Sequence, residues 1–159
     1  KLNCRIEGLT GYSPKRIILD RSLSIKKNSY TFLSSNNKNT IIFYNKGSRT
    51  KFNQLSKKGI KLIKLPLNNN NFFDLKLTLQ KIYSLGCRNL LVEGGKNLTN
   101  SFLKNKLFNQ FYLFKSPIKL GSAGKINISS QLHTLPFIYK NKTKLNSFTG
   151  KDIIYLYSK

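Results

Sequence analysis

The sequence lacks several residue types that would narrow its function. Its 159 residues include no methionine, no tryptophan and a single histidine, His133. Because a complete translation product begins with methionine, we expect a processed chain or, more simply, a fragment. A lone histidine in a polar loop is more typical of a structural or solvated side chain than of a catalytic one. The sequence therefore assigns no residue to catalysis itself.

Cysteine and long apolar runs are also scarce. Cys4 and Cys87 form no CxxC motif and have no histidine near them in sequence, so no metal site is predicted. We interpret both as free thiols of a reducing cytoplasm, with a disulfide as the alternative. No apolar run approaches the about 20 residues of a membrane span, and the N-terminus has no signal-peptide core. These features predict a cytoplasmic protein with no membrane partner.

Acidic residues are few, and this makes the charge extreme. Five acids stand against 29 lysines and arginines, which gives a formal net charge of +24. Such a charge is compatible with nucleic acid or with anionic small molecules. The basic residues are mostly lysine and are scattered through every segment rather than gathered in one block. We therefore attribute the charge chiefly to compositional drift and predict no nucleic-acid partner.

The most informative stretch, 90–103, reads LLVEGGKNLTNSFL. The apolar run 89–92 lacks polar alternation, which is typical of a strand covered on both faces. Glu93 ends the run, and Gly94 and Gly95 follow. Apolar residues then recur at helical spacing, at Leu98, Phe102, Leu103 and Leu107. This order of a strand, an acid, two glycines and a helix is typical of a phosphate-binding turn. The positive N-terminus of the helix faces whatever lies over the glycines. The alternative is a plain strand–helix connection.

Hydrophobic patterns predict an α/β chain without an internal repeat or a dividing linker. Expected strands are 16–20, 40–44, 60–65, 89–92, 110–119 and 152–158, with a further short strand at 30–33. Expected helices are 52–58, 73–85 and one that follows Gly95. Expected loops are 7–14, 22–39, 66–71 and 121–134. A strand at 60–65, a helix and a strand at 89–92 imply a right-handed crossover and a parallel pair.

Three segments carry a resemblance to a known family. LLVEGGKNLTNSFLKNKLFNQFYLFKSPIKLG resembles the signature of the reductase domain of riboflavin biosynthesis, VEGG-x-x-L-x-x-S-F-L followed by a polar linker and a strand ending P-K-L-x-G. KRIILDRSL at 15–23 is similar to that family's strand and D-[SR]-x-L turn. KLNCR at 1–5 is similar to the tail of its D-D-P-x-L-x-x-R segment, whose D-D-P would lie before residue 1.

The resemblance implies a fold like that of dihydrofolate reductase. This is an α/β fold with a mixed, mostly parallel central sheet flanked by helices, and antiparallel strands at the C-terminal end. The domain is usually the C-terminal half of a bifunctional pyrimidine deaminase/reductase and tends to form homodimers. We therefore expect residues 1–159 to be a partial reductase domain, inactive alone. Its beginning, and any deaminase domain, would lie upstream.

The resemblance also implies a reaction and its cofactor. The reaction is NADPH-dependent reduction of the ribosyl group of 5-amino-6-(5-phosphoribosylamino)uracil to the ribityl group. Cofactor positions are matched by Gly94, Gly95, Lys96, Asn97, Leu98, Thr99, Asn100 and Ser101. Arg21 matches a further cofactor position, where its charge would suit the 2′-phosphate of NADPH. The alternative for Arg21 is a simple ion pair with Asp20.

Substrate positions of the family are matched by Leu2, Arg5 and Glu93. A guanidinium can bind the ribose 5-phosphate through two parallel hydrogen bonds, and a carboxylate can accept bonds from the pyrimidine or the ribityl hydroxyls. The alternatives are a solvated charge for Arg5 and packing for Leu2.

Two other functions compete with this one. Another reductase of the dihydrofolate reductase fold, acting on a pterin, would keep the glycines but would need no acid before them. A basic RNA-binding module would use the charge, but no RNP-like, KH-like or zinc-knuckle motif is present.

Overall fold

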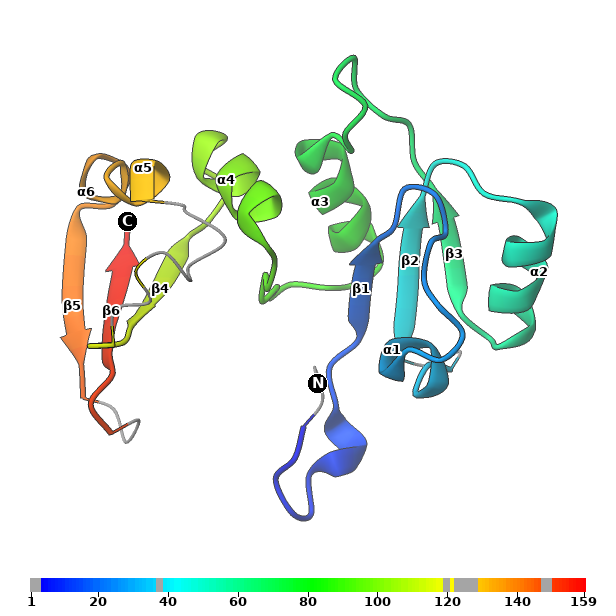
Figure 1. Ribbon diagram of the computed structural model, residues 1–159, viewed down its shortest axis with the longest axis horizontal. Coiled ribbons are helices and arrows are strands. Elements are labelled where there is room, and N and C mark those ends of the chain that lie inside the picture. The colour runs from blue at the N-terminus through cyan, green and yellow to red at the C-terminus, as the bar shows by residue number, and fades with distance from the viewer. Residues whose placement is uncertain (1–3, 37–38, 119–120, 122–128, 147–149) are drawn as a thin grey trace. The chain divides into compact units, whose positions relative to one another are not determined.

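The computed structural model describes residues 4–36, 39–118, 121, 129–146 and 150–159. The chain divides into two compact units, Lys1–Gly86 and Cys87–Lys159. Each unit contains one three-stranded sheet with its own hydrophobic core, and Figure 1 shows the elements of both.

The first unit is built on a parallel sheet. Its strands are β1 (Arg16–Leu19), β2 (Thr40–Tyr44) and β3 (Lys61–Lys64), in the order β1-β2-β3. Ile18, Ile42 and Leu62 lie side by side in the register. β2 is buried over most of its length, as its unbroken apolar sequence requires of a central strand covered on both faces.

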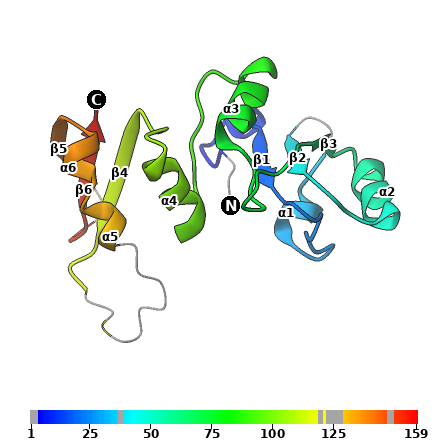
Figure 2. The same ribbon diagram turned by 90° about the horizontal axis from the view of Figure 1, so that it is seen from above.

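Helices lie against the strands of this unit. They are α1 (Tyr30–Leu33), α2 (Arg49–Lys57) and α3 (Leu75–Ser84), and the 3₁₀ turn η1 (Thr10–Tyr12) precedes β1. α1 and α2 supply Phe32 and Leu55 to the core around Ile42. Viewed from above, α3 lies on the other side of the strands from α1 (Figure 2). The helices begin at side-chain caps, namely Ser29 for α1, Ser48 for α2 and Asp74 for α3.

The second unit is built on an antiparallel sheet. It begins with α4 (Lys96–Lys104), β4 (Gln110–Lys115), α5 (Ser129–Leu132) and α6 (Leu135–Ile138). β5 (Asn141–Leu145) and β6 (Ile153–Ser158) follow, and the sheet order is β4-β6-β5.

Within this unit, helices cover one face of the sheet and leave the other uncovered. α4 and α6 contribute Leu103 and Leu135 to a core with Tyr139 and Tyr157, against which Phe111 packs. Burial raises the pKa of the Tyr139 hydroxyl, which donates a hydrogen bond to the Phe108 carbonyl. Side chains alternate across a strand, so the register assigns a second set of residues to the opposite face. That set is Gln110, Tyr112, Phe114, Asn141, Thr143, Leu145, Ile154, Leu156 and Ser158.

Most of the expected elements are confirmed, with shifted ends. The strands expected at 16–20, 40–44, 60–65, 110–119 and 152–158 are present, although part of 110–119 lies outside the described residues. The helices expected at 52–58, 73–85 and after Gly95 are also present. α2 begins three residues early, at Arg49, because Ser48 caps it. The fold class is therefore confirmed: an α/β chain with parallel strands first and antiparallel strands at its C-terminal end.

Two expected strands are wrong. Residues 89–92 form no strand, and Leu91 is 77% exposed. The parallel pair expected between this run and 60–65 is therefore not formed, because an apolar pattern makes a strand only when a partner strand lies beside it. Residues 30–33 form the helix α1, where the Ser29 hydroxyl accepts from the Phe32 N–H and the Ser34 hydroxyl donates to the Tyr30 carbonyl.

Candidate functional site

The turn that follows β1 is fixed by a buried carboxylate. Asp20 accepts hydrogen bonds from the backbone N–H and hydroxyl of Ser24, at 2.8 and 3.0 Å, and from the N–H of Ile25 at 2.9 Å. Leu23, inside this turn, is buried and has φ 55°, a conformation that L residues adopt rarely. A Cβ on Gly47, in the loop after β2, would lie 2.6 Å from Leu23 Cδ1. Hydrogen bonds to Asp20 and close packing of Leu23 against Gly47 therefore fix the backbone at the carboxyl edge of the first sheet.

Arg21 does not pair with Asp20, so that alternative is wrong. Its Nη1 donates to the backbone carbonyl of Asn71, 2.5 Å away and 50 residues along the chain. Asn71 has φ 60° and belongs to the loop 67–73, which joins β3 to α3. The side chain expected to contact the cofactor therefore also holds a neighbouring loop at the carboxyl edge of the parallel strands, where α/β sheets bind ligands.

The loop 67–73 has an ordered interior. Leu67 and Phe73 close it as an isolated bridge. The Asn68 side-chain oxygen accepts from the backbone N–H groups of Asn70 and Phe72, each at 3.0 Å. The Asn68 N–H in turn donates to the Phe72 carbonyl at 2.7 Å. The expected loop at 66–71 is therefore present, and the Asn68 side chain gives it a fixed conformation by replacing backbone hydrogen-bond partners.

Phe72 is a candidate site residue that the sequence analysis missed. It is 60% exposed, whereas Phe73 beside it is half-buried. The available signal was the Phe-Phe pair directly after the asparagine run, because one of two adjacent residues in an extended segment points away from the core.

The acid of the glycine motif lies in a different setting from the one expected. Glu93 is exposed and follows the run 89–92, which forms no strand and is exposed except at the half-buried Val92. No side chain or backbone group in the described part of the chain bonds to its carboxylate. Glu93 is therefore available to a ligand, but no buried strand presents it.

The two glycines differ in what surrounds them. A Cβ on Gly94 would lie 2.7 Å from Leu98 Cδ2 and 3.1 Å from Leu98 Cβ, so a side chain there would require Leu98, in the first turn of α4, to shift. A Cβ on Gly95 would meet no atom within 4 Å. The space over Gly95 is therefore open, as a phosphate that approaches the backbone requires.

The N-terminus of α4 offers free donors. Gly95 is its N-cap and provides no side-chain hydrogen bond, whereas α1, α2 and α3 each have one. The first turn contains no acidic residue and begins with Lys96, whose positive charge adds to the positive end of the helix dipole. This combination disfavours a bare helix end and favours a bound anion, so these residues fit the phosphates of a dinucleotide.

The remaining side chains of this helix lie on different faces. Thr99 and Ser101 donate their hydroxyls to the carbonyls of Gly94 and Asn97, at 3.5 and 2.9 Å, so their oxygens keep lone pairs for a ligand. Asn100 Oδ1 is buried and has no hydrogen-bond partner among the described residues. Phe102 and Leu103 are buried, and the Phe102 ring stacks on Phe108 with centroids 4.9 Å apart, which fixes the orientation of the helix.

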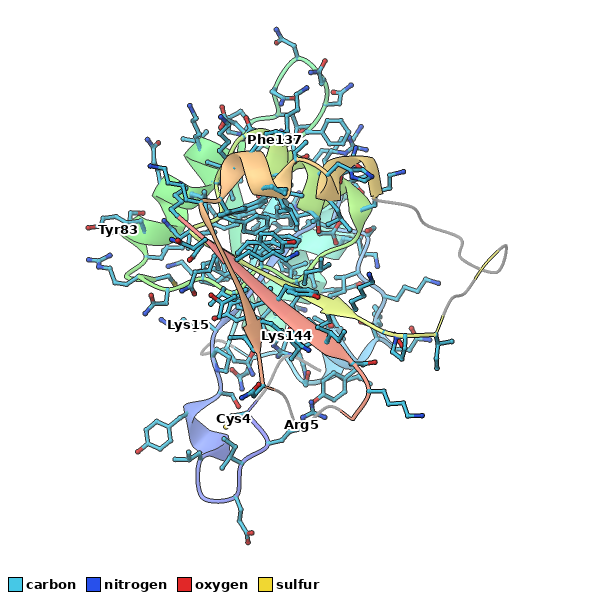
Figure 3. All side chains as sticks on the ribbon, turned by 90° about the vertical axis from the view of Figure 1, so that its left-hand side faces the viewer. Cys4, Arg5, Lys15, Tyr83, Phe137 and Lys144 are labelled. Carbon is cyan, nitrogen blue, oxygen red and sulfur yellow. The ribbon has the colours of Figure 1, made fainter. Side chains whose placement is uncertain are left out.

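The other expected residues are less informative. Arg5 is exposed and lies in the stretch before η1, next to Cys4, as Figure 3 shows. Leu2 lies outside the described residues. Both cysteines are free thiols, and His133 is exposed. Within the described ranges no group of three His, Cys, Asp or Glu side chains gathers as a metal site would require. No helix in the same ranges is long and apolar enough to cross a membrane.

The chain is similar to known proteins over most of its length. The family described as the RibD C-terminal domain matches residues 1–150. The riboflavin biosynthesis protein RibD of Aquifex aeolicus is 30% identical over 153 residues, which cover 94% of this chain and 40% of that protein. The 2,5-diamino-6-ribosylamino-4(3H)-pyrimidinone 5′-phosphate reductase of Debaryomyces hansenii is 29% identical over 145 residues, 84% of this chain and 58% of that protein. The chain thus spans between two fifths and three fifths of these relatives.

Solved structures share the fold. Acinetobacter baumannii RibD superposes with a TM-score of 0.67 at 20% identity, covering 97% of this chain and 40% of that one. A pyrimidine reductase-like protein from Corynebacterium diphtheriae gives 0.66 at 16% identity, covering 92% of this chain and 61% of that one.

Proposed function

The chain belongs to the RibD C-terminal domain family, and on this basis we propose that it is the reductase part of a riboflavin-biosynthesis enzyme. The reaction is the reduction of the ribosyl group of 5-amino-6-(5-phosphoribosylamino)uracil to the ribityl group, with NADPH as cofactor. The observation that carries the proposal is the VEGG turn, which leads into a helix N-terminus that is uncapped, positively charged and open over Gly95.

This chain's residues would divide the work between cofactor and substrate. The N–H groups at the start of α4, with Lys96, would bind the pyrophosphate of NADPH, and the hydroxyls of Thr99 and Ser101 would add acceptors or donors. Arg21 keeps guanidinium N–H groups beyond the one bonded to Asn71, and these would suit the 2′-phosphate. Held by these residues, the cofactor would supply the hydride that reduces C1′ of the ribosyl group.

The substrate would be held by charge. Arg5 is exposed and would bind the 5-phosphate, while Glu93, exposed and unbonded within the described residues, would accept hydrogen bonds from the pyrimidine or from ribityl hydroxyls. Leu2, which lies outside the described residues, would be a further substrate-binding residue. We assign no residue to proton transfer. The two free thiols agree with a cytoplasmic location.

The decisive experiment is a reduction assay with the full-length protein and alternative substrates. We expect NADPH oxidation with the phosphoribosylamino-pyrimidine. Its 2,5-diamino precursor belongs in the same assay, because the Debaryomyces relative is named for that compound. Dihydrofolate in a parallel reaction tests a pterin reductase. Oxidation with dihydrofolate alone would overturn the proposal, as would the absence of NADPH binding.

We also propose that the full-length protein is a homodimer, through the uncovered face of the second sheet. Tyr112 and Phe114 on this face are 47% and 63% exposed. No residue of the face carries a charge, so two copies can meet there without opposing the lysines of a chain with net charge +24. Phe114→Lys should convert a dimer into a monomer in analytical ultracentrifugation, and an unchanged mass would exclude this face.

A further inference from the structure

Phe72 presents an aromatic ring at the carboxyl edge of the β1-β2-β3 sheet. It is 60% exposed and lies in the loop 67–73, which rises from the end of β3 (Figure 1). A single exposed phenylalanine is common on protein surfaces. Whether the ring binds a ligand must therefore be judged from how the Phe72 backbone is held and from the residues beside it.

The backbone around Phe72 is fixed from three directions. Asn68 Oδ1 accepts from the Phe72 N–H, and the Phe72 carbonyl accepts from the Asn68 N–H. Phe73 and Leu67 close the loop behind it. Arg21 Nη1 bonds to the carbonyl of the peptide that joins Asn71 to Phe72. An exposed ring on a backbone held in this way is pre-organised for contact with a partner.

Arg21 and Phe72 together form a recognisable chemical pair. Arg21 bonds to the peptide next to Phe72, so its guanidinium lies beside the Phe72 backbone at the carboxyl edge of the sheet, where α/β sheets bind ligands. An aromatic ring stacks on a nucleobase, and a guanidinium binds phosphate. The ligand that offers a flat base beside a phosphate is an adenine nucleotide.

We propose that Phe72 stacks on the adenine ring of the dinucleotide cofactor, and that Arg21 is a positioning residue that holds Phe72 in place through the Asn71 carbonyl. The use of a dinucleotide rests on the proposed function, but the assignment of Phe72 goes beyond it. Arg21 thereby affects every adenine-containing ligand, in addition to any contact that it makes with a 2′-phosphate.

Binding measurements on the full-length protein test this assignment without turnover. NADPH, NADH and adenosine 2′,5′-bisphosphate all contain adenine and are titrated by calorimetry. Phe72→Ala should weaken all three by about tenfold. Phe72→Tyr keeps the aromatic face and should stay within about twofold of the wild type. Tyr12→Ala is the matched control, because Tyr12 is an exposed aromatic residue of η1, ahead of the amino end of β1.

Arg21→Gln separates positioning from direct phosphate binding. If Arg21 positions Phe72, this variant weakens NADH as well as NADPH, because both rely on the stacked adenine. A loss confined to NADPH and the bisphosphate would overturn the positioning role, because NADH lacks the 2′-phosphate.

Other outcomes decide the assignment of Phe72 and of the cofactor separately. Unchanged affinity in Phe72→Ala, or a loss that Tyr12→Ala reproduces, would overturn the stacking role and leave the proposed reductase intact. If Phe72→Ala lowers the melting temperature, Phe72→Leu keeps the apolar volume without the aromatic face and should show the same loss of affinity. A wild type that binds neither NADPH nor NADH would overturn the proposed function itself.

Discussion

Arg21 and Glu93, two side chains on which the proposed function depends, are held very differently. Arg21 is bonded to the Asn71 carbonyl, and its turn is fixed by the buried carboxylate of Asp20. Glu93 is exposed, and nothing in the described residues bonds to it. A side chain bonded inside the protein contributes to folding as well as to ligand binding, whereas an unbonded exposed one contributes little to folding. Substitution of Glu93 should therefore change ligand binding or activity without changing the stability of the fold.

We predict that Glu93→Gln keeps the fold and the affinity for NADPH but lowers kcat/KM for the pyrimidine substrate by about ten- to a hundredfold. Hydrogen bonds to a charged acceptor contribute about 1.5–3 kcal/mol, and the neutral amide loses that charge. The measurements are steady-state reduction, a cofactor titration and a melting curve of the full-length protein. A lower melting temperature with intact activity would instead make Glu93 a structural acid.

At the scale of elements, the glycine turn and α4 show how a helix end becomes a candidate binding site. A Cβ on Gly94 would crowd Leu98, whereas a Cβ on Gly95 would meet open space. The two adjacent glycines thus have separable roles. Phe102 and Leu103 bury the other side of α4 and keep its N-terminus in place.

We predict opposite effects from substitutions at the two glycines. Gly95→Val should lower the melting temperature only slightly, because valine is a poorer N-cap than glycine. It should weaken NADPH binding at least about tenfold, or roughly 1.4 kcal/mol, because the side chain enters the space of the pyrophosphate. Gly94→Ala, the matched control, should lower the melting temperature because its Cβ meets Leu98. NADPH affinity that survives in a folded Gly95→Val variant would exclude phosphate binding at this turn.

The same elements show what local sequence can and cannot predict. α2 and α3 were predictable because their periodicity and caps lie within the segment, as at Ser48 and Asp74. The run 89–92 was not, because pairing is non-local and the residues form no strand here. β5 was missed because NKTKL, an edge strand with exposed lysines, lacks apolar alternation.

The candidate site follows the same division. The glycine turn and the following helix were predictable from adjacent residues alone. The bond from Arg21 to Asn71 spans 50 residues, and only the folded chain reveals it together with the exposed ring of Phe72. Sequence patterns therefore predicted the glycine turn that we propose binds phosphate, whereas the loop that we assign to adenine required the structure.

At the scale of the whole chain, uncovered apolar surface and unpaired strand edges are prominent. Among the described strands, β1 and β3 each pair only with β2, and β4 and β5 each pair only with β6. Large apolar side chains elsewhere in the chain are also exposed, with Leu91 at 77%, Ile118 at 75% and Phe137 at 88%. Edges and apolar patches of this kind promote association. The net charge of +24 opposes association by repulsion between copies.

We predict that residues 1–159 expressed alone turn over no substrate and aggregate more as salt is added. At about 1 M salt the Debye length falls to about 3 Å, so the repulsion between copies is screened while the apolar attraction remains. Light scattering at increasing sodium chloride, beside a reduction assay with NADPH, measures both effects. The matched variant Phe137→Lys on α6 should scatter less at every salt concentration, because it removes exposed apolar surface and adds charge. A monodisperse chain that reduces the pyrimidine at the full-length rate would show that residues 1–159 contain the whole catalytic site.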